Sequence, residues 1–314
     1  MDPHEPGLIL AGDVGGTNAR FAAFRPGEPP RAPAWERTVP SRSGASFLEV
    51  LRAILPELPG AVVAASFGVA GPVLGGVCRA TNLPWIVDGA EVAHTLGLCT
   101  AGLVNDLEAH ALGVEVLGAA DVEVLQAGAP DPHGPTALVF AGTGLGKAGT
   151  IVVDGVRRAF PCEGGHVSFS PGTEREVRLW RRLAALHGHV SWERVVSGSG
   201  LLAVYELVRD EEGASDVPQV AEARTGDGYG AAILRAATDG ASPVADRALE
   251  LFASLYGSVA GNSALELLAT GGVHLGGGLA PRLLPWLRRP AFLESFLGKG
   301  RLRPILDRSA LAGH

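Results

Sequence analysis

The 314-residue sequence contains few cysteines and few aromatic residues. Its three cysteines, Cys78, Cys99 and Cys162, are odd in number, widely spaced and without a C-x-x-C pair. This pattern argues against both a disulfide framework and a structural zinc site, and it favours buried thiols. An aromatic content of 6% beside 44 glycines is typical of a compact α/β enzyme with many tight turns.

Neither sign of charge dominates, and no long apolar run is present. The 26 Lys and Arg and 33 Asp and Glu are mixed along the chain, so no basic stripe is available for a nucleic-acid backbone. The apolar runs near Val62 and Val139 are too short to span a bilayer, and the polar start, residues 1–7, lacks a signal-peptide pattern. We therefore expect a soluble cytoplasmic protein that binds neither nucleic acid nor a membrane.

Two stretches share one pattern, in which a strand-like segment, a glycine-rich turn and a second strand-like segment follow one another. The first covers residues 8–24 and the second covers residues 136–153. Because 314 residues exceed the size at which one hydrophobic core usually stops growing, two domains are expected. The repeated pattern suggests duplicated halves, which is a hypothesis at this point.

The remaining periodicity predicts an α/β first half and a mostly helical second half around a smaller sheet. Buried strands are expected over 62–66 and 102–104, with helices over 88–96 and 106–114. Further helices are expected over 174–187, over 200–209 and from Pro243 onward, where Ser242 supplies a cap.

The first glycine-rich turn contains Asp13, Gly15, Gly16, Thr17 and Asn18. Glycines let backbone N–H groups approach an anion, and Thr17 and Asn18 add side-chain donors, so this turn suits phosphate. The alternative is a tight hairpin whose glycines only supply positive φ angles. Asp13 favours the phosphate interpretation, because a carboxylate beside phosphate is repulsive unless a magnesium ion or its waters lie between them.

The second turn contains Gly142, Thr143 and Gly144, and residues 144–149 match G-x-G-x-x-G, the dinucleotide fingerprint. That fingerprint requires a helix after the turn, whereas residues 150–153 are mostly β-branched and strand-like. The sequence therefore predicts a second phosphate-binding hairpin and not a Rossmann turn.

Asn105 and Asp106 follow an apolar strand directly, at the end where open α/β sheets place their ligands. A carboxylate there can accept the proton of an attacking hydroxyl group. The alternative is that one of the two residues only caps the helix that follows.

Glu163, His166 and Glu193 add two acids and an imidazole in glycine-flanked or polar stretches. A carboxylate can accept from two neighbouring hydroxyls and a histidine can donate or accept, so such a set can bind a pyranose. The alternatives are a solvated charge for Glu193 and an ordinary loop residue for His166.

A third glycine-rich segment covers residues 271–278 and begins with Gly271 and Gly272, before a helix-like stretch. The functional interpretation is a surface for the adenosine of a nucleotide. The alternative is a flexible loop, since three consecutive glycines reduce order.

Taken together, the segments resemble the bacterial glucokinase family of the actin-like sugar kinase superfamily, from about Leu10 to about Pro304. Seven stretches match in the family's order: Ala11–Arg20, Thr81–Trp85, Asn105-Asp106, Ala141–Gly146, Glu163–Val167, Glu193–Gly198 and Gly271–Val273. The related repressor/ORF/kinase family carries a cysteine-rich zinc site after its Glu-Gly-Gly-His element. No cysteine follows residues 167–171 here, so that branch is disfavoured.

The resemblance implies roles for the candidate residues. Asn105, Asp106, Glu163, His166 and Glu193 would hold the hexose, with Asp106 as the catalytic base. Backbone and side-chain groups of both glycine turns, Gly15, Gly16, Thr17, Asn18, Gly142, Thr143 and Gly144, would flank the phosphates of ATP. Gly271 and Gly272 complete the predicted nucleotide set, and Asp13 would face Mg2+ through a water molecule.

The implied fold is α/β, a two-domain actin-like (ribonuclease H-like) sugar kinase fold with a central cleft. Residues 1–110 would form the small domain, completed by about 300–314, and residues 111–299 the large one. Family members usually continue with another strand and helix beyond the equivalent of Leu311–His314, so a weaker small domain is expected. A homodimer is expected from the resemblance alone.

The expected activity is that of a glucokinase, which uses ATP to phosphorylate the 6-hydroxyl of glucose. A kinase for another hexose and a non-catalytic sugar sensor on the same fold are the alternatives. Only seven residues precede the first predicted strand, which leaves no room there for a DNA-binding module and disfavours the sensor. The donor remains open between ATP, ADP and polyphosphate.

Overall fold

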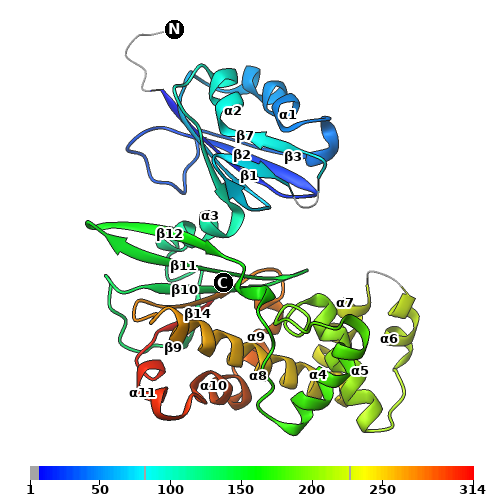
Figure 1. Cartoon of the computed structure of the whole chain (residues 1–314). Helices are drawn as coiled ribbons and strands as arrows, with labels where there is room; N and C mark the ends of the chain where they lie inside the picture. Colours follow the sequence, from blue (N-terminus) through cyan, green and yellow to red (C-terminus); the bar gives the residue numbers. More distant parts are fainter. Residues whose placement is uncertain (1–6, 81–82, 226–227) are drawn as a thin grey trace. The chain divides into compact units, whose positions relative to one another are not determined.

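The computed structural model describes residues 7–80, 83–225 and 228–314. The chain divides into two compact units, unit 1 (Met1–Val116) and unit 2 (Leu117–His314), which are coloured from blue to cyan and from green to red in Figure 1. The boundary follows Val116 rather than residue 110, because a boundary at 110 would cut the helix Asp106–Gly113.

Unit 1 contains a mixed five-stranded sheet with the order β3-β2-β1-β4-β8, and a small sheet β5-β6-β7. Its strands are β1 (Leu8–Val14), β2 (Asn18–Phe24), β3 (Trp35–Pro40), β4 (Val62–Val69), β5 (Val73–Leu74), β6 (Val77–Arg79), β7 (Ile86–Asp88) and β8 (Gly102–Asn105). Its helices are α1 (Phe47–Ile54), α2 (Gly89–Leu96) and α3 (Asp106–Gly113), with 3-10 turns at Ser41–Ser43, Leu55–Glu57 and Val114–Val116.

Alternating apolar residues build the core of unit 1 between its large sheet and α1. Ser46 caps α1 by accepting a hydrogen bond from the Glu49 N–H, which fixes where the helix begins. From α1, Phe47 packs edge-on against Phe67 of β4, with ring centroids 5.2 Å apart, and both side chains are buried. This cluster holds α1 against β4. Strand β4 lies next to β1, and β1 leads into the first glycine turn.

Unit 2 contains a six-stranded sheet with the order β12-β11-β10-β13-β14-β9. Its strands are β9 (Glu123–Gln126), β10 (Thr136–Ala141), β11 (Leu145–Val153), β12 (Val156–Cys162), β13 (Gly272–Gly276) and β14 (Leu311–Gly313). Its helices are α4 (Glu174–His187), α5 (Gly198–Glu211), α6 (Pro218–Glu222), α7 (Tyr229–Thr238), α8 (Pro243–Glu266), α9 (Ala280–Leu287), α10 (Pro290–Leu297) and α11 (Arg303–Leu306), with 3-10 turns at Gly164–His166, Ala223–Thr225 and Gly300–Leu302.

The two large sheets repeat one arrangement. In each, three antiparallel strands (β3-β2-β1 or β12-β11-β10) are followed by two strands parallel to the third (β4-β8 or β13-β14). Unit 2 adds β9 as an antiparallel edge strand, so its sheet is the larger of the two and not the smaller one expected. The repeated arrangement extends the similarity of the two hairpins to five strands and supports the hypothesis of duplicated halves.

The last residues of the chain belong to unit 2. Strand β14 pairs in parallel with β13, where Val273 faces Leu311, and antiparallel with β9. The expectation that about 300–314 complete the smaller domain is therefore wrong for this structure. The physical reason is burial: the apolar residue Leu311 is fully buried in the sheet of unit 2.

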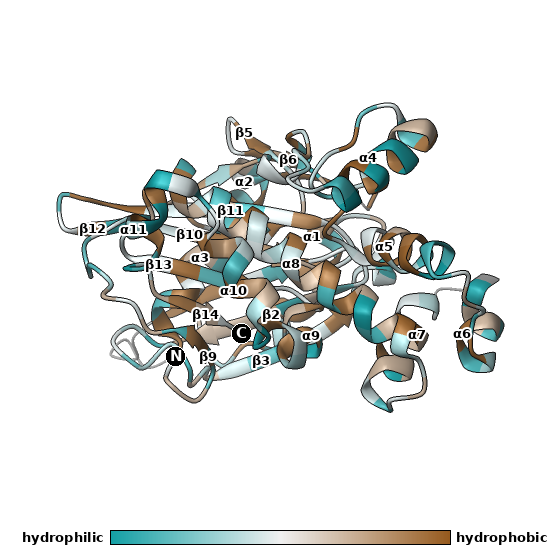
Figure 2. Cartoon of the chain, turned by 90° about the horizontal axis from the view of Figure 1, so that it is seen from below, coloured by the Kyte–Doolittle hydropathy of each residue, from teal (hydrophilic) through white to brown (hydrophobic). Residues whose placement is uncertain are grey.

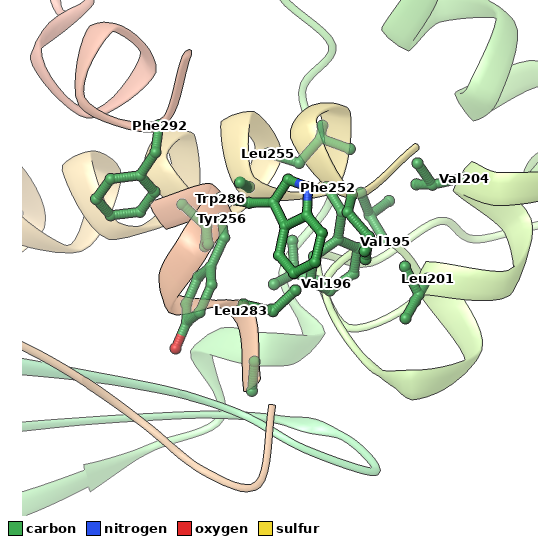
Figure 3. Close-up of a cluster of buried hydrophobic side chains, with 14 of the residues drawn as sticks. Val195, Val196, Leu201, Val204, Phe252, Leu255, Tyr256, Leu283, Trp286 and Phe292 are labelled. Carbon is green, nitrogen blue, oxygen red and sulfur yellow. The ribbon is translucent and has the colours of Figure 1, made fainter. Parts of the chain in front are cut away.

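Helix α8 is the centre of the helical layer of unit 2. From this helix, Phe252, Leu255 and Tyr256 pack with Trp286 of α9 and Phe292 of α10 in one buried cluster (Figure 3). The Tyr256 hydroxyl donates to the Val139 carbonyl of β10 at 2.7 Å, which ties the helix to the sheet. Truncating a buried aromatic side chain of this kind to alanine typically costs about 3–5 kcal/mol of stability.

The helix predicted over 174–187 is confirmed as α4. Hydrophilic and hydrophobic residues alternate along it in Figure 2. Leu179 and Leu183 are buried, while Arg178 donates to Glu211 of α5 at 2.7 Å on the polar side. Among the described residues, no helix has both the length and the apolar character needed to cross a membrane.

Candidate active site

The first glycine turn joins β1 to β2 in unit 1. Asp13 lies one residue before the end of β1, level with Gly68 on β4, and its side chain is exposed. The Gly15 N–H donates to the Asn18 carbonyl at 3.1 Å and closes the turn. The side chains of Thr17 and Asn18 are exposed, so the turn presents two polar side chains and a carboxylate at one end of the sheet.

Ser41, which was not predicted from the sequence to have a role, binds this turn through two hydrogen bonds. Ser41 is fully buried, and its hydroxyl donates to the Gly15 carbonyl at 2.6 Å. Its backbone N–H donates to the Thr17 carbonyl at 2.9 Å. Both carbonyls of the turn are therefore directed toward Ser41, and Ser41 fixes the shape of the turn through two bonds.

Asn105 and Asp106 lie at the junction of β8 and α3, as the sequence predicted. Asn105 is the cap: its side-chain oxygen accepts from the Leu107 N–H at 2.9 Å, and Glu108 accepts from the Asn105 N–H in return at 3.0 Å. The Asn105 amide also donates to the Gly71 carbonyl at 3.0 Å. Asp106 Oδ1 also accepts from the Leu107 N–H at 2.9 Å, but the capping box is formed by Asn105 and Glu108.

Asp106 lies in an environment that favours its neutral form more than water does. Burial raises the pKa of this carboxyl, and the negative charge of Asp13 raises it further, whereas the Leu107 N–H and His110 act in the opposite direction. Asp13 is level with Gly68 on β4, and Gly68 is level with Val104 on β8, so Asp13 and Asp106 share one end of the sheet. A carboxylate with a raised pKa is a stronger base than an ordinary aspartate.

Gly68 allows α3, and with it Asp106, to lie close to β4. The sequence analysis did not identify this residue. A Cβ at this position would lie 3.0 Å from the Ala109 Cβ and 3.7 Å from the Asp106 Cα. A side chain at position 68 would therefore displace α3 and with it the carboxylate. The only signal in the sequence is a glycine near the end of a buried strand, where a close backbone approach is one explanation.

The second glycine turn joins β10 to β11 in unit 2. Gly142 donates its N–H to the Gly144 carbonyl at 2.8 Å and accepts from the Gly198 N–H at 2.8 Å. Gly198 is the first residue of α5, which Ser197 caps. The predicted strand after the turn is confirmed as β11, so the dinucleotide fingerprint over 144–149 was correctly rejected.

Glu193 supports the second turn through its side chain. One carboxylate oxygen accepts from the Leu145 N–H at 3.1 Å. A Cβ at Gly144 would lie 2.5 Å from the same oxygen, so only glycine leaves room for the carboxylate. Glu193 is therefore a structural neighbour of the turn as well as a candidate ligand for sugar.

Three of the predicted sugar ligands come together in unit 2. His166 lies between two acids, with Nδ1 3.8 Å from a Glu193 oxygen and Nε2 3.9 Å from a Glu163 oxygen. The Glu193 N–H donates to the Gly165 carbonyl at 2.9 Å, which joins the two segments. The side chains of Glu163 and His166 are 72% and 60% exposed, so their polar atoms remain accessible to hydroxyl groups.

Gly271 and Gly272 do not lie beside the second turn. They lie at the start of β13, where Gly272 faces Thr136, the first residue of β10. The turn follows the other end of β10, Ala141, roughly 17 Å away at about 3.3 Å per residue. The glycines beside the turn are Gly276 to Gly278 instead: the next residue, Leu279, donates its N–H to the Ala141 carbonyl at 3.0 Å. The placement of Gly271 and Gly272 in the nucleotide site is corrected accordingly.

Two further predicted features can be placed only in part. Thr81 and Asn82 of the matched stretch Thr81–Trp85 lie outside the described residues, while Trp85 is buried and packs against Phe47. Within the described part of the chain, no group of three or more His, Cys, Asp or Glu side chains is placed to hold a metal ion. Mg2+ is commonly bound by one or two carboxylates together with phosphate and water, so Asp13 alone is a suitable protein ligand.

The fold and the sites can be compared with known proteins. A family model described as Glucokinase matches residues 10–310. A glucokinase from Nostoc sp. is 36% identical over 315 residues, which cover 95% of this chain and 92% of that protein. A solved glucokinase from an Antarctic psychrotroph matches with a TM-score of 0.86 at 30% identity, covering 98% of this chain and 94% of that one.

A more distant structure shares the fold alone. It is a ROK family glucokinase from Streptomyces griseus, solved in complex with glucose and AMPPNP, with a TM-score of 0.62 at 22% identity and coverage of 98% and 94%. The predicted α/β fold of the actin-like sugar kinases is confirmed by these likenesses.

Proposed function

Because the chain belongs to the glucokinase family and is an ATP-dependent hexose kinase, we propose that it phosphorylates the 6-hydroxyl of glucose with Asp106 as the base. The product would be glucose 6-phosphate, and the reaction would be the first step of glycolysis. The observation that carries the proposal is the position of Asp106, after a parallel strand and at the same end of the sheet as Asp13, with a helix cap supplied by Asn105.

The proposed role of Asp106 is to take the proton of the attacking hydroxyl as it adds to the γ-phosphorus of ATP. In phosphoryl transfer the protein mainly positions the reactants and neutralises charge, so one base and well-placed donors are sufficient. The raised pKa of Asp106 supports this role, because a carboxylate whose pKa is raised by burial is a better proton acceptor.

The proposed role of Glu163, His166 and Glu193 is to bind the hexose, together with Asn105 and Asp106. Their support is the cluster around His166, where two carboxylates and an imidazole present acceptors and donors within one small region of unit 2. A pyranose with adjacent hydroxyls fits such a set.

The proposed phosphate ligands are the backbone N–H groups of Gly16 and Gly144, with the side chains of Thr17, Asn18 and Thr143. Gly15 and Gly142 would flank the phosphates, since their own N–H groups bond within the turns. Adenosine is assigned to the segment Gly276–Gly278, which replaces Gly271 and Gly272. The assignment rests on the two turns and on the neighbourhood of the Gly142 turn and Leu279. Asp13 would hold Mg2+, whose charge would neutralise phosphate oxygens, most simply through a water ligand.

A homodimer in the cytoplasm completes the proposal. The three cysteines are free, which agrees with a reducing compartment where ATP is available. Of these thiols, which were expected to be buried, only Cys78 is buried, while Cys99 and Cys162 are exposed. The dimer rests on the family alone, and light scattering that gives only a particle near the 32.3 kDa chain mass would contradict it.

Asp106→Asn tests the assignment of the base. Asparagine keeps the size of the side chain and most of its hydrogen bonds but cannot accept the proton, so turnover should fall by about 10²- to 10⁴-fold. Glucose affinity measured by calorimetry should stay within a few-fold of the wild type. If Asp106 only stabilised the start of α3, asparagine would serve nearly as well. A variant that keeps more than about a tenth of wild-type turnover would therefore exclude Asp106 as the essential base.

A further inference from the structure

A buried lysine lies directly under the loop that carries Glu163 and His166. Lys147, on β11, has a side chain that is only 4% exposed. Its backbone faces Cys162, the residue before the loop, across the β11–β12 ladder. Lysine is almost never buried without a partner, because its ammonium group loses its hydration. Its burial at this position therefore has a specific cause.

The partner of Lys147 is the carboxylate of Glu266. The two groups are 2.6 Å apart, and Glu266 is the last residue of α8, with a side chain that is 51% exposed. A carboxylate at the C-terminal end of a helix opposes the helix dipole, so the lysine charge compensates for an otherwise unfavourable position. The ion pair fixes the end of the lysine side chain in one place.

The aliphatic part of Lys147 supports the loop. A Cβ on Gly164 would lie 2.9 Å from Cδ and 3.0 Å from Cε of this lysine. The next residue, Gly165, leaves no room for a Cβ against the Leu145 carbonyl of the same strand. Both glycines of the loop thus rest on β11, and the two predicted sugar ligands flank them in the sequence, at positions 163 and 166.

We infer that Lys147 is a positioning residue for hexose binding. It acts by fixing the position of the Glu163–His166 loop relative to β11. The inference rests on the proposed function, because that function assigns Glu163 and His166 to the sugar. Lys147 does not touch the reacting groups in this role. Its stem sets where the loop lies, and its ion pair with Glu266 sets where the stem lies.

The competing explanation is that the ion pair only ties α8 to the sheet. Lys299 offers a control, since it is a partly buried lysine of unit 2 and its Cε would lie 2.6 Å from a Cβ on Gly261. Its ammonium group donates to the Ser258 carbonyl at 3.0 Å and to Asn262 at 2.7 Å, both on α8. Lys299 therefore shares with Lys147 a stem that packs on a glycine and an ammonium group bound to α8, but its acceptors are neutral and its stem packs on α8 instead of the loop.

The experiment compares Lys147→Ala with Lys299→Ala in the full chain. Both should lower the melting temperature. Only Lys147→Ala should raise the KM and the calorimetric Kd for glucose, by about tenfold, since a displacement of a binding group by 1 Å can cost up to about 100-fold. Only this variant should speed amide hydrogen exchange in residues 163–166, and the KM for ATP should stay within about twofold of wild type in both variants. Lys147→Arg, which keeps the charge and a long stem, should restore most of the glucose affinity.

Two outcomes overturn the inference: a folded Lys147→Ala variant with wild-type glucose affinity, or one with wild-type exchange in the loop. If Lys147→Ala does not fold, Lys147→Met, which keeps the stem but loses the ion pair, takes its place with the same two measurements. Failure of the wild-type protein to phosphorylate glucose would contradict the proposed function instead, and the hydrogen exchange of residues 163–166 would still decide whether Lys147 holds the loop.

Discussion

The two glycine turns have the same place in their sheets but are held in different ways. In unit 1, Ser41 binds the carbonyls of Gly15 and Thr17 from a neighbouring 3-10 turn. In unit 2, Glu193 accepts from the Leu145 N–H directly after the turn, and the Gly198 N–H binds the Gly142 carbonyl. The first turn is therefore held by a residue with no proposed contact to either substrate, whereas the second is held partly by a proposed sugar ligand.

This difference has a functional consequence. A residue that supports a phosphate turn and also binds sugar links the two substrates, because a change in its position affects both. Glu193 has this dual position, since its other oxygen lies 3.8 Å from His166. Ser41, which holds the first turn, is not a proposed sugar ligand, so loss of its support should affect the nucleotide alone.

Glu193→Ala should have the largest effect of the variants that test this comparison. It removes a hydrogen bond to a charged acceptor, a loss of about 1.5–3 kcal/mol, so the kcat/KM for each substrate should fall by about 10- to 100-fold. Steady-state kinetics with glucose and ATP varied in turn measures both values. Glu163→Ala is the matched control, because Glu163 is 72% exposed and should affect glucose alone. An unchanged KM for ATP in Glu193→Ala would contradict the proposal that Glu193 links the binding of the two substrates.

Ser41→Ala should have a smaller and more selective effect. It removes one neutral hydrogen bond to the Gly15 carbonyl, a change of about 0.5–1.5 kcal/mol, so the KM for ATP should rise by about 2- to 10-fold. The KM for glucose should not change. Ser43→Ala is the control, because Ser43 lies in the same 3-10 turn but donates to Pro40 and is exposed. Equal effects of the two variants would show that Ser41 has no special role at the turn.

The smallest expected effect is on the pH dependence of kcat/KM. A variant of the first turn should shift it, and a variant of the second turn should not. Asp106 must be ionised to act as a base, so kcat/KM should fall as the pH falls through its pKa. Burial and the charge of Asp13 raise that pKa, so the fall should begin at a higher pH than for an ordinary aspartate, whose pKa is about 3.9. In Asp13→Asn the pKa of Asp106 should be lower, and the acid limb of the normalised profile should move to lower pH. Thr143→Ala, on the second turn, should leave the limb in place, and an unmoved limb in Asp13→Asn would contradict the coupling.

The sequence was sufficient for features that depend on local patterns. The helix over 174–187 and the strands on both sides of each turn follow from hydrophobic periodicity and glycine spacing. The junction of Asn105 and Asp106 follows from a strand end and a capping residue, although which of the two caps the helix required the hydrogen bonds. Chemistry carried by short motifs was therefore recognisable.

Features that depend on distant pairing were not predictable. Gly271 and Gly272 looked equivalent to Gly276–Gly278 in the sequence, and only the parallel register of β10 and β13 separates them. The pairing of β14 with β13 joins residues far apart in the chain, so local patterns could not assign the C-terminal residues to unit 2. Ser41 and Lys147 carry no local signal, because their roles arise from contacts with Gly15 and Glu266.

The most direct test of the account is the activity of the purified protein with ATP, Mg2+ and glucose, measured by coupled detection of glucose 6-phosphate. The account predicts one glucose 6-phosphate for each ATP consumed, with glucose preferred over mannose, glucosamine and N-acetylmannosamine. Absence of turnover with glucose, or comparable turnover with N-acetylmannosamine, would contradict it.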